Sequence, residues 1–187
     1  MPVVRAKPFI QNLPIDISCP FFDANGMLHF LCEDTGTVMM IDEVEKITTV
    51  HSTQGMPSGG LFDKDGTLYV TDFAHGSVLA VQLDTGEQDA LVGVYEDKPL
   101  KGPNTITQDK FGNFYFTDSG PFGQTGLDNP TGSLFTITNS PTGQILKPLS
   151  LENLAYPSGV AVSPNGKFMY VNEDFMFFLW LMYTHTW

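Results

Sequence analysis

A short phrase anchored on a glycine occurs four times along the chain, and it restricts the fold more than any other feature. Aligned on that glycine, the copies read SCPFFDANGMLHFLC, SGGLFDKDGTLYVTD, NTITQDKFGNFYFTD and SGVAVSPNGKFMYVN, with turn glycines Gly26, Gly66, Gly112 and Gly166. An Asn-Gly or Asp-Gly turn between β-rich runs is typical of a hairpin. The glycines lie 40, 46 and 54 residues apart, and hairpins that recur every ~40–50 residues are typical of propeller blades. The sequence therefore predicts an all-β fold, a β-propeller.

The turn residues divide the chain into about three and a half blades of four short strands each. The expected strands cover 18–22, 28–32, 37–41 and 46–51 in blade one, 60–62, 67–71, 77–83 and 88–94 in blade two, and 105–108, 113–117, 132–138 and 144–149 in blade three. Residues 120–131 are rich in Gly, Pro and Asn and should form a surface loop. A fourth blade begins at Pro157 and is cut short after Asn172. The alternative fold, a β-sandwich, offers no reason for the repeated phrase.

Two flanking segments do not follow the repeat. We expect residues 1–14 to form a leader or edge strand, residues 15–174 the blades, and residues 175–187 an aberrant apolar tail. The tail reads FMFFLWLMYTHTW and has neither a turn residue nor alternation of apolar and polar residues. Because an incomplete fourth blade cannot close a ring, the simplest interpretation is a truncated chain with an unrelated end. The alternative is an adhesive strand used for dimerisation.

Composition excludes several classes of protein. With 42% hydrophobic and 16% charged residues the chain is not a disordered protein. A formal net charge of −12 without a basic patch argues against a nucleic-acid partner. The N-terminus lacks an apolar run of signal-peptide length, and the apolar run in the tail is shorter than the ~20 residues of a membrane helix. We therefore expect a soluble, cytoplasmic protein without a membrane partner, in which Cys19 and Cys32 are free thiols, a disulfide being the alternative.

The third copy of the phrase also carries a resemblance to a known family. GPNTITQDKFGNFYFTDSG, followed by TGSLFTI, resembles the gluconolactonase, senescence-marker-protein and diisopropyl-fluorophosphatase family, and YPSGVAVSPNGKFMYVNE resembles the next blade of that family. The resemblance implies a six-bladed propeller with calcium or another divalent cation in its central channel. It also implies a hydrolase of lactones or organophosphates that is roughly twice this length.

The resemblance assigns candidate residues to the metal and substrate site. Asn104 matches the asparagine that positions metal or substrate in the third blade, and Thr105 stands where an acidic residue usually follows it. Ser18 and Ser158 fall on the positions of a first-blade glutamate and a fourth-blade asparagine. A fifth-blade aspartate, which is a metal ligand and in lactonases a general base, would lie beyond Trp187.

The repeat places the same residues together without the resemblance. Eight residues before the turn glycines stand Ser18, Ser58, Asn104 and Ser158, which should open the innermost strands at the channel mouth. Ca²⁺ takes ~6–8 oxygen ligands, usually including carboxylates. Three hydroxyls and one amide supply no countercharge for a cation, so the sequence predicts a poor metal site.

Several other titratable residues have plain structural interpretations. Asp72 and Asp118 occupy equivalent blade positions and should accept hydrogen bonds from backbone amides; Asp118 is kept as a weaker candidate for the site, as is Thr105. A structural hydrogen bond is expected for His75, and solvation in a turn for Glu33, although Glu33 could also be drawn into the channel.

Two functions follow from these observations. The first is a gluconolactonase-like, metal-dependent hydrolase of lactones or related esters, degenerate or truncated in this chain, with calcium as the expected cofactor. The second is a non-catalytic propeller that serves as a binding platform. The expected partner is a small-molecule lactone or ester, and self-association through the open blade edge or the apolar tail is a further expectation.

Overall fold

The computed structural model describes residues 17–42, 46–141 and 143–174, and its regular structure is all β. The predicted leader at 1–14 and the predicted tail at 175–187 lie outside these residues. The strands form three four-stranded antiparallel sheets, each with its strands in chain order, and two two-stranded antiparallel sheets. Within the described ranges there is no helix with the length and hydropathy to cross a membrane.

The observed strands agree closely with the predicted ones. They are β1 (Ser18–Phe22), β2 (Leu28–Cys32), β3 (Thr37–Ile41) and β4 (Ile47–Ser52) in blade one; β5 (Pro57–Phe62), β6 (Leu68–Asp72), β7 (Ser77–Val81) and β8 (Gln88–Val92) in blade two; β11 (Pro103–Gln108), β12 (Phe114–Asp118), β13 (Gly132–Ser140) and β14 (Gly143–Leu154) in blade three; and β15 (Pro157–Val162) and β16 (Met169–Glu173) in blade four. The prediction missed a small hairpin of β9 (Val94–Tyr95) and β10 (Lys98–Pro99). Its turn residues Glu96 and Asp97 adopt positive φ without a glycine to mark them.

An aspartate and a glycine form the turn of each of the first three inner hairpins. The Oδ1 atom of Asp63 accepts hydrogen bonds from the Asp65 and Thr67 amides at 2.9 and 3.0 Å, and Asp23 and Asp109 do the same in blades one and three. The turn glycines have φ between +69° and +86°, which a residue with a Cβ adopts only under strain. Local turn chemistry therefore fixes the register of these hairpins.

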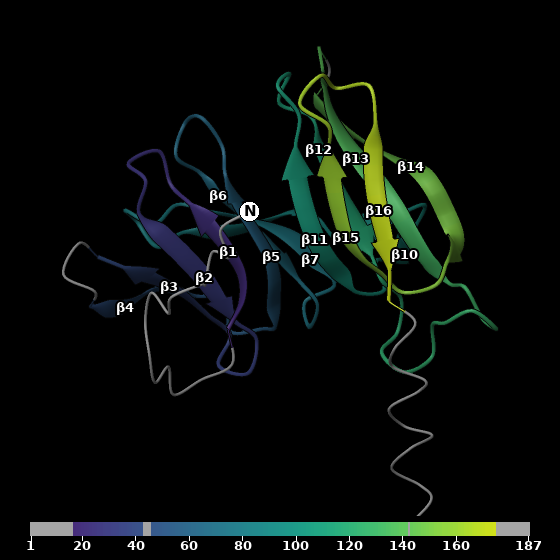
Figure 1. Cartoon of the computed structure of the whole chain (residues 1–187), viewed down its shortest axis with the longest axis horizontal. Helices are drawn as coiled ribbons and strands as arrows, with labels where there is room; N and C mark the ends of the chain where they lie inside the picture. The colour runs from purple at the N-terminus through teal and green to yellow at the C-terminus, as the bar shows by residue number, and fades with distance from the viewer. Residues whose placement is uncertain (1–16, 43–45, 142, 175–187) are drawn as a thin grey trace, which may run out of the picture.

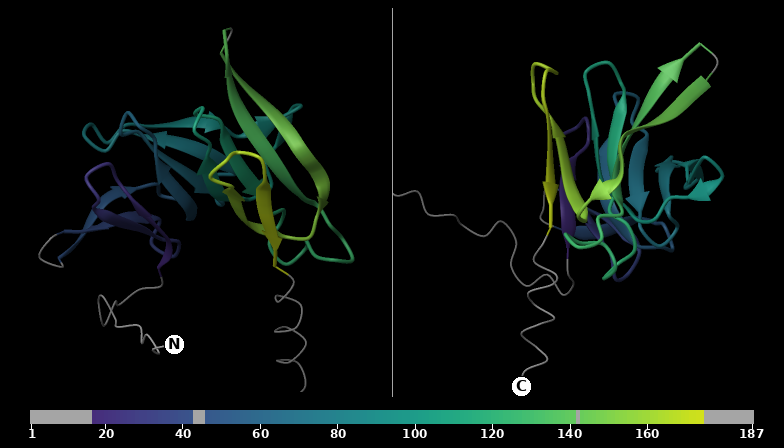
Figure 2. Two further views of the ribbon diagram at one scale, coloured as in Figure 1. Left: turned by 45° about the horizontal axis from the view of Figure 1, so that its top comes forward. Right: turned by 90° about the vertical axis from the view of Figure 1, so that its right-hand side faces the viewer.

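The sheets follow one another around an arc in chain order (Figure 1; Figure 2, left). Their first strands lie side by side, since β5 contacts both β1 and β11, and β11 contacts β15. This arrangement confirms the predicted propeller, here as three complete blades and half of a fourth. Both cysteines are free thiols, as the sequence predicted.

Apolar side chains fill the space between neighbouring blades. One buried cluster joins blades one and two, and a second joins blades two and three. In the second cluster the Tyr69 ring packs on the Phe114 ring of the next blade at a centroid distance of 4.4 Å. Farther out, His51 Nε2 and Gln88 Oε1 lie 2.8 Å apart and connect the last strands of blades one and two. Contacts between blades therefore hold the arc together.

Blade four ends on an exposed strand. Among the described residues β16 pairs only with β15, whereas the second strand of each other blade also pairs with a third strand. Phe168 and Tyr170 are 61% and 63% exposed there. Tyr170 aligns with Tyr69, whose ring is covered by the next blade. The face of blade four that would meet a further blade is thus open to solvent.

The turn before β16 is longer than its counterparts, and this corrects the alignment made from spacing. The Ser163 amide bonds to the Phe168 carbonyl, whereas the Asp63 amide bonds to the nearer Thr67 carbonyl. As a result Glu173, rather than Asn172, occupies the position of Asp72 and Asp118. The pairs that show this are Pro57–Asp72, Pro103–Asp118 and Pro157–Glu173.

Candidate functional site

The polar residues selected by the repeat stand where the first strand of each blade begins. In all four hairpins the ladder is irregular at this point, for example between Pro57 and Gly59 and between Pro103 and Ile106. A bulge turns the backbone out of the ladder and re-aims side chains and carbonyls. Ser58 and Asn104 lie within such irregular steps, so their side chains are not constrained by regular strand pairing.

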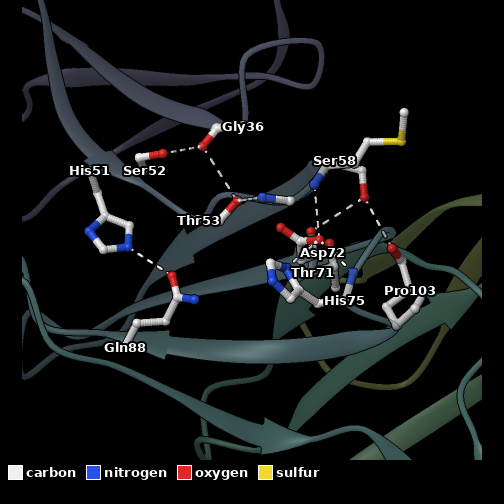
Figure 3. Close-up of polar contacts among 12 residues, drawn as sticks. Gly36, His51, Ser52, Thr53, Ser58, Thr71, Asp72, His75, Gln88 and Pro103 are labelled. Atoms are coloured by element: carbon white, nitrogen blue, oxygen red, sulfur yellow. Dashed lines mark hydrogen bonds and ion pairs between the residues drawn. The ribbon is translucent and has the colours of Figure 1, made fainter.

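The start of β5 is bonded to the start of β11. Ser58 Oγ lies 3.1 Å from the Pro103 carbonyl oxygen and 3.4 Å from that of Thr71 (Figure 3). The Thr71 hydroxyl donates to the Asn104 carbonyl. A Cβ on Gly59 would overlap this same carbonyl, so the close approach of the two strands requires glycine. The Ser58 hydroxyl therefore serves the contact between blades two and three.

The start of β11 is bonded in turn to the start of β15. Thr105 Oγ1 donates to the Ser158 carbonyl at 2.6 Å and lies 3.3 Å from Asn104 Oδ1. Ser158 Oγ accepts a hydrogen bond from Asn172 Nδ2 at 2.9 Å. Asn104, Thr105 and Ser158 are thus brought together where β11 and β15 begin. Among the described residues, the amide nitrogen of Asn104 makes no hydrogen bond and can donate to a ligand.

Ser18, the fourth candidate, opens β1 and is removed from this network. Its hydroxyl oxygen is buried, and no described residue bonds to it. Among the described residues no hydrogen bond joins its hydroxyl to Asn104; β1 contacts β5, and β5 contacts β11. The structure therefore brings three of the predicted residues together and leaves Ser18 apart.

These residues do not fit a calcium ion. The hydroxyls of Ser58 and Thr105 already donate to carbonyl oxygens, and the Ser158 hydroxyl is bonded to Asn172. In the ranges 17–42, 46–141 and 143–174 no group of three or more His, Cys, Asp or Glu side chains could hold a metal ion. Because a hard cation needs charged oxygens to offset its lost hydration, this donor set cannot retain calcium.

A buried carboxylate and a histidine lie next to the start of β5. Asp72 is fully buried, and its Oδ1 accepts hydrogen bonds from the Met56 amide at 3.0 Å and the His75 amide at 2.9 Å. His75 Nδ1 lies 3.0 Å from the same oxygen (Figure 3). A Cβ on Gly55 would overlap the carboxylate and the imidazole. His75 thus has the structural hydrogen bond that the sequence predicted. The ring fits beside Asp72 because Gly55 has no side chain.

Asp118 holds the equivalent place in blade three and is not exposed at the channel mouth. Its carboxylate accepts hydrogen bonds from the backbone amides of Lys101 and Gly102. Burial raises the pKa of Asp118, and those two amides and the Lys101 charge act in the opposite direction. In blade four Glu173 accepts from the Ala155 amide in the same manner. Each of these carboxylates therefore fixes the backbone segment that leads into the first strand of its own blade.

The comparison with protein families gives one match that covers most of the chain. Residues 18–184 match the family described as SMP-30/Gluconolactonase/LRE-like region. The match includes every blade of the structure and all of the candidate residues named above.

Similar proteins include lactonases and solved propellers. Lactonase drp35 of Staphylococcus saprophyticus is 30% identical over 185 residues, which cover 92% of this chain and 53% of the lactonase. The structure of a gluconolactonase from Xanthomonas campestris superposes with a TM-score of 0.73 at 22% identity, covering 85% of this chain and 55% of that one. A calcium-binding protein, regucalcin, from Agrobacterium tumefaciens gives a TM-score of 0.68 at 18% identity, over 84% and 50% of the two chains. This chain therefore spans about half the length of these propellers.

Proposed function

The chain belongs to the SMP-30/gluconolactonase/LRE-like family, and on this premise we propose that it acts on lactones or related esters as a gluconolactonase-like hydrolase. Asn104 carries the proposal, because its amide nitrogen is a donor without a described partner among the polar residues that open the inner strands of blades two to four. The proposed substrate is a small molecule, and the proposed location is the cytoplasm.

The chemistry of an ester bond gives Asn104 a specific role. When water attacks the carbonyl carbon, negative charge develops on the carbonyl oxygen, and a fixed N–H donor stabilises that charge. The Asn104 side chain is half-buried and stands at an irregular step of β11. In this proposal its amide binds the carbonyl oxygen of the substrate and strengthens that hydrogen bond as the charge develops.

Calcium is the cofactor that the family resemblance suggests, and the donors described above do not support it. In the family chemistry a bound cation would polarise the ester carbonyl. We expect millimolar calcium to leave the thermal midpoint unchanged, since only a ligand that binds the folded state raises it. A calcium-dependent rise in the midpoint would contradict this and restore the metal-dependent form of the proposal.

The experiment that tests the proposal compares Asn104→Ala with the matched control Asn165→Ala. Asn165 lies in the exposed turn of blade four, at the other end of its hairpin. With an aliphatic lactone as substrate, we expect Asn104→Ala to lower kcat/KM about 100-fold, as for loss of one oxyanion donor, and Asn165→Ala to leave it unchanged. Equal activity of the two variants would contradict a role for Asn104.

A non-catalytic binding platform is the second candidate. It is favoured by the hydroxyls of Ser58 and Thr105, which are committed to bonds between blades and are not available to reacting groups. Saturable binding of a lactone without any hydrolysis, lost on Asn104→Ala, would support this function over the first.

Self-association is the remaining proposal about partners. The open edge of β16, its exposed Tyr170 and the exposed Phe168 just before the strand would allow a second copy to pair along it. Sedimentation velocity should then show a concentration-dependent dimer that Tyr170→Lys abolishes. A monomer at all concentrations would contradict it.

A further inference from the structure

Three aromatic rings from three different blades contact one another in a row. The Phe122 ring meets the Phe73 ring at a centroid distance of 6.5 Å and an angle of 90°. It meets the Tyr156 ring on its other side, at 6.4 Å and 74°. Phe73 follows the end of β6, Phe122 lies in the long loop of blade three, and Tyr156 directly precedes β15. We refer to Phe73, Phe122 and Tyr156 as the aromatic strip.

The aromatic strip lies at the end of the propeller where the candidate site is found. A Cβ on Gly102 would overlap the Phe73 ring, so this ring rests on the backbone just before Asn104. Tyr156 in turn stands just before Ser158. Since Asn104 and Ser158 open neighbouring inner strands, the strip borders the polar residues of the proposed site.

Phe122 is held in place although it is 58% exposed. The loop that carries it begins with Gly120 at a φ of +87°. It is closed by the Thr125 and Thr131 hydroxyls, whose oxygens lie 2.7 Å apart. An aromatic ring presented to solvent on a bonded loop offers a ready contact surface for an apolar ligand group. The repeat does not account for this ring, because blades one and two have only a short turn at the corresponding place, after β2 and after β6.

Charge at the Tyr156 end of the strip disfavours an anionic ligand. Burial raises the pKa of the Tyr156 phenol, and the negative charges of Glu33 and Asp174 raise it further. The phenol therefore stays neutral. Glu33 belongs to the turn after β2 in blade one, so two blades contribute negative charge here. A carboxylate in the ligand would be repelled by both.

Among the described residues that open the inner strands, few polar groups remain to bind the hydroxyls of a sugar. The hydroxyls of Ser58, Thr105 and Ser158 take part in the bonds already described. A polyhydroxylated ligand loses its own hydrogen bonds to water and needs partners in the site to replace them. Beside the aromatic strip, the Asn104 amide can bind one carbonyl oxygen but cannot satisfy several hydroxyl groups.

We propose that the channel mouth selects neutral cyclic esters with an apolar ring or alkyl substituent over polyhydroxylated sugar lactones. The apolar substituent lies on the aromatic strip, and the ester carbonyl faces Asn104. This proposal narrows the substrate class of the function proposed above. It rests on that function only in taking an ester as the ligand. Binding to the strip is measurable without any turnover, so the two can fail separately.

Two lactams, which resist hydrolysis, test the proposal on the whole chain by isothermal titration calorimetry. One is a six-membered lactam with a pentyl substituent, and the other is gluconolactam. We expect the pentyl lactam to bind at least about tenfold more tightly. Phe122→Ala should weaken its binding about fivefold to tenfold, the order of one aromatic contact. The same substitution should leave the weak binding of gluconolactam unchanged.

Phe111→Ala provides the matched control. Phe111 is 76% exposed, but it lies in the turn at the far end of the β11–β12 hairpin from Asn104. It should leave binding of the pentyl lactam unchanged. Tighter or equal binding of gluconolactam, absence of binding by both lactams, or equal effects of the two phenylalanine variants would overturn the proposal. Binding of the pentyl lactam without hydrolysis of the matching lactone would support the strip and contradict the hydrolase.

Discussion

Blades two and three close their inner hairpins with equivalent aspartates whose surroundings differ. Asp72 and Asp118 lie opposite Pro57 and Pro103 in the same register. In blade three both Asp118 oxygens accept from the backbone that leads into β11. In blade two one oxygen of Asp72 receives all of the described hydrogen bonds, and the other is buried without a described partner.

The difference arises from the residue that faces each carboxylate. Lys101 precedes β11 and carries its side chain outward to Glu152, with Nζ and Oε1 2.7 Å apart. The corresponding Gly55 has no side chain, which leaves room for the His75 ring beside Asp72. The corresponding position before the first strand is thus a lysine in blade three and a glycine in blade two, where a histidine from the segment after β6 lies beside the carboxylate. The same blade position therefore gives a structural bond in each case, but different chemistry around it.

The largest effect is expected for removal of the blade-two carboxylate. Asp72→Ala leaves the amides of Met56 and His75 without their acceptor, and should lower the free energy of unfolding by about 3 kcal/mol. Urea denaturation measures it. The control Asp65→Ala, at an exposed aspartate of the turn at the other end of the hairpin, should stay within about 0.5 kcal/mol. Similar losses in both variants would contradict the proposed role of Asp72.

Gly55→Ala tests whether the histidine requires the bare backbone. The added methyl group would overlap Asp72 and His75, and we expect a loss of about 1–3 kcal/mol in unfolding free energy. His75→Ala should recover part of the lost unfolding free energy, because it removes the imidazole, one of the two groups that the added methyl group would overlap. A double-mutant cycle in urea measures the coupling. If the two changes in unfolding free energy are strictly additive, the His75 ring is not the reason that position 55 requires glycine.

Glu173→Ala extends the comparison to blade four. Because Glu173 accepts from the Ala155 amide, its loss should cost about 1 kcal/mol. The neighbour Asn172 bonds to Ser158 at an exposed site, so Asn172→Ala should cost about half as much or less. Thermal unfolding of the Glu173→Ala and Asn172→Ala variants measures which of them loses more stability. The reverse order would favour the alignment made from spacing over the observed register.

The smallest effect is a pH dependence of blade three. Burial raises the pKa of Asp118 above 3.8, its usual value, so the folded state holds the proton more tightly than the unfolded chain. Stability should therefore fall as pH rises from 3.8 through the raised pKa, by at most about 1.4 kcal/mol per pH unit. Asp118→Asn should remove this part of the slope. An unchanged slope in urea titrations at several pH values would contradict it.

The sequence predicted the hairpins well and the site only in part. Turn chemistry is local, so Asp63 and Gly66 specify their hairpin without help from distant residues. The grouping of Asn104 with Ser158 also followed from the repeat. The aromatic strip was missed, since Phe122 lies in a loop that blades one and two do not have, and its neighbours come from two other blades. The long loop itself, with an exposed phenylalanine among glycines, was the available signal.

What the sequence determined by itself is the blade: glycines at positive φ and aspartates in the turns set each hairpin and the spacing between them. What the tertiary structure decided is the use of each polar side chain. The Ser58 hydroxyl is bonded to a carbonyl of the adjacent blade, the Ser158 hydroxyl accepts from Asn172 of its own blade, and one extra turn residue places Glu173 instead of Asn172 at the position of Asp72. The physical reason is that hydrogen-bond partners and buried charges are shared between blades far apart in sequence, and only their packing decides which groups remain for a ligand.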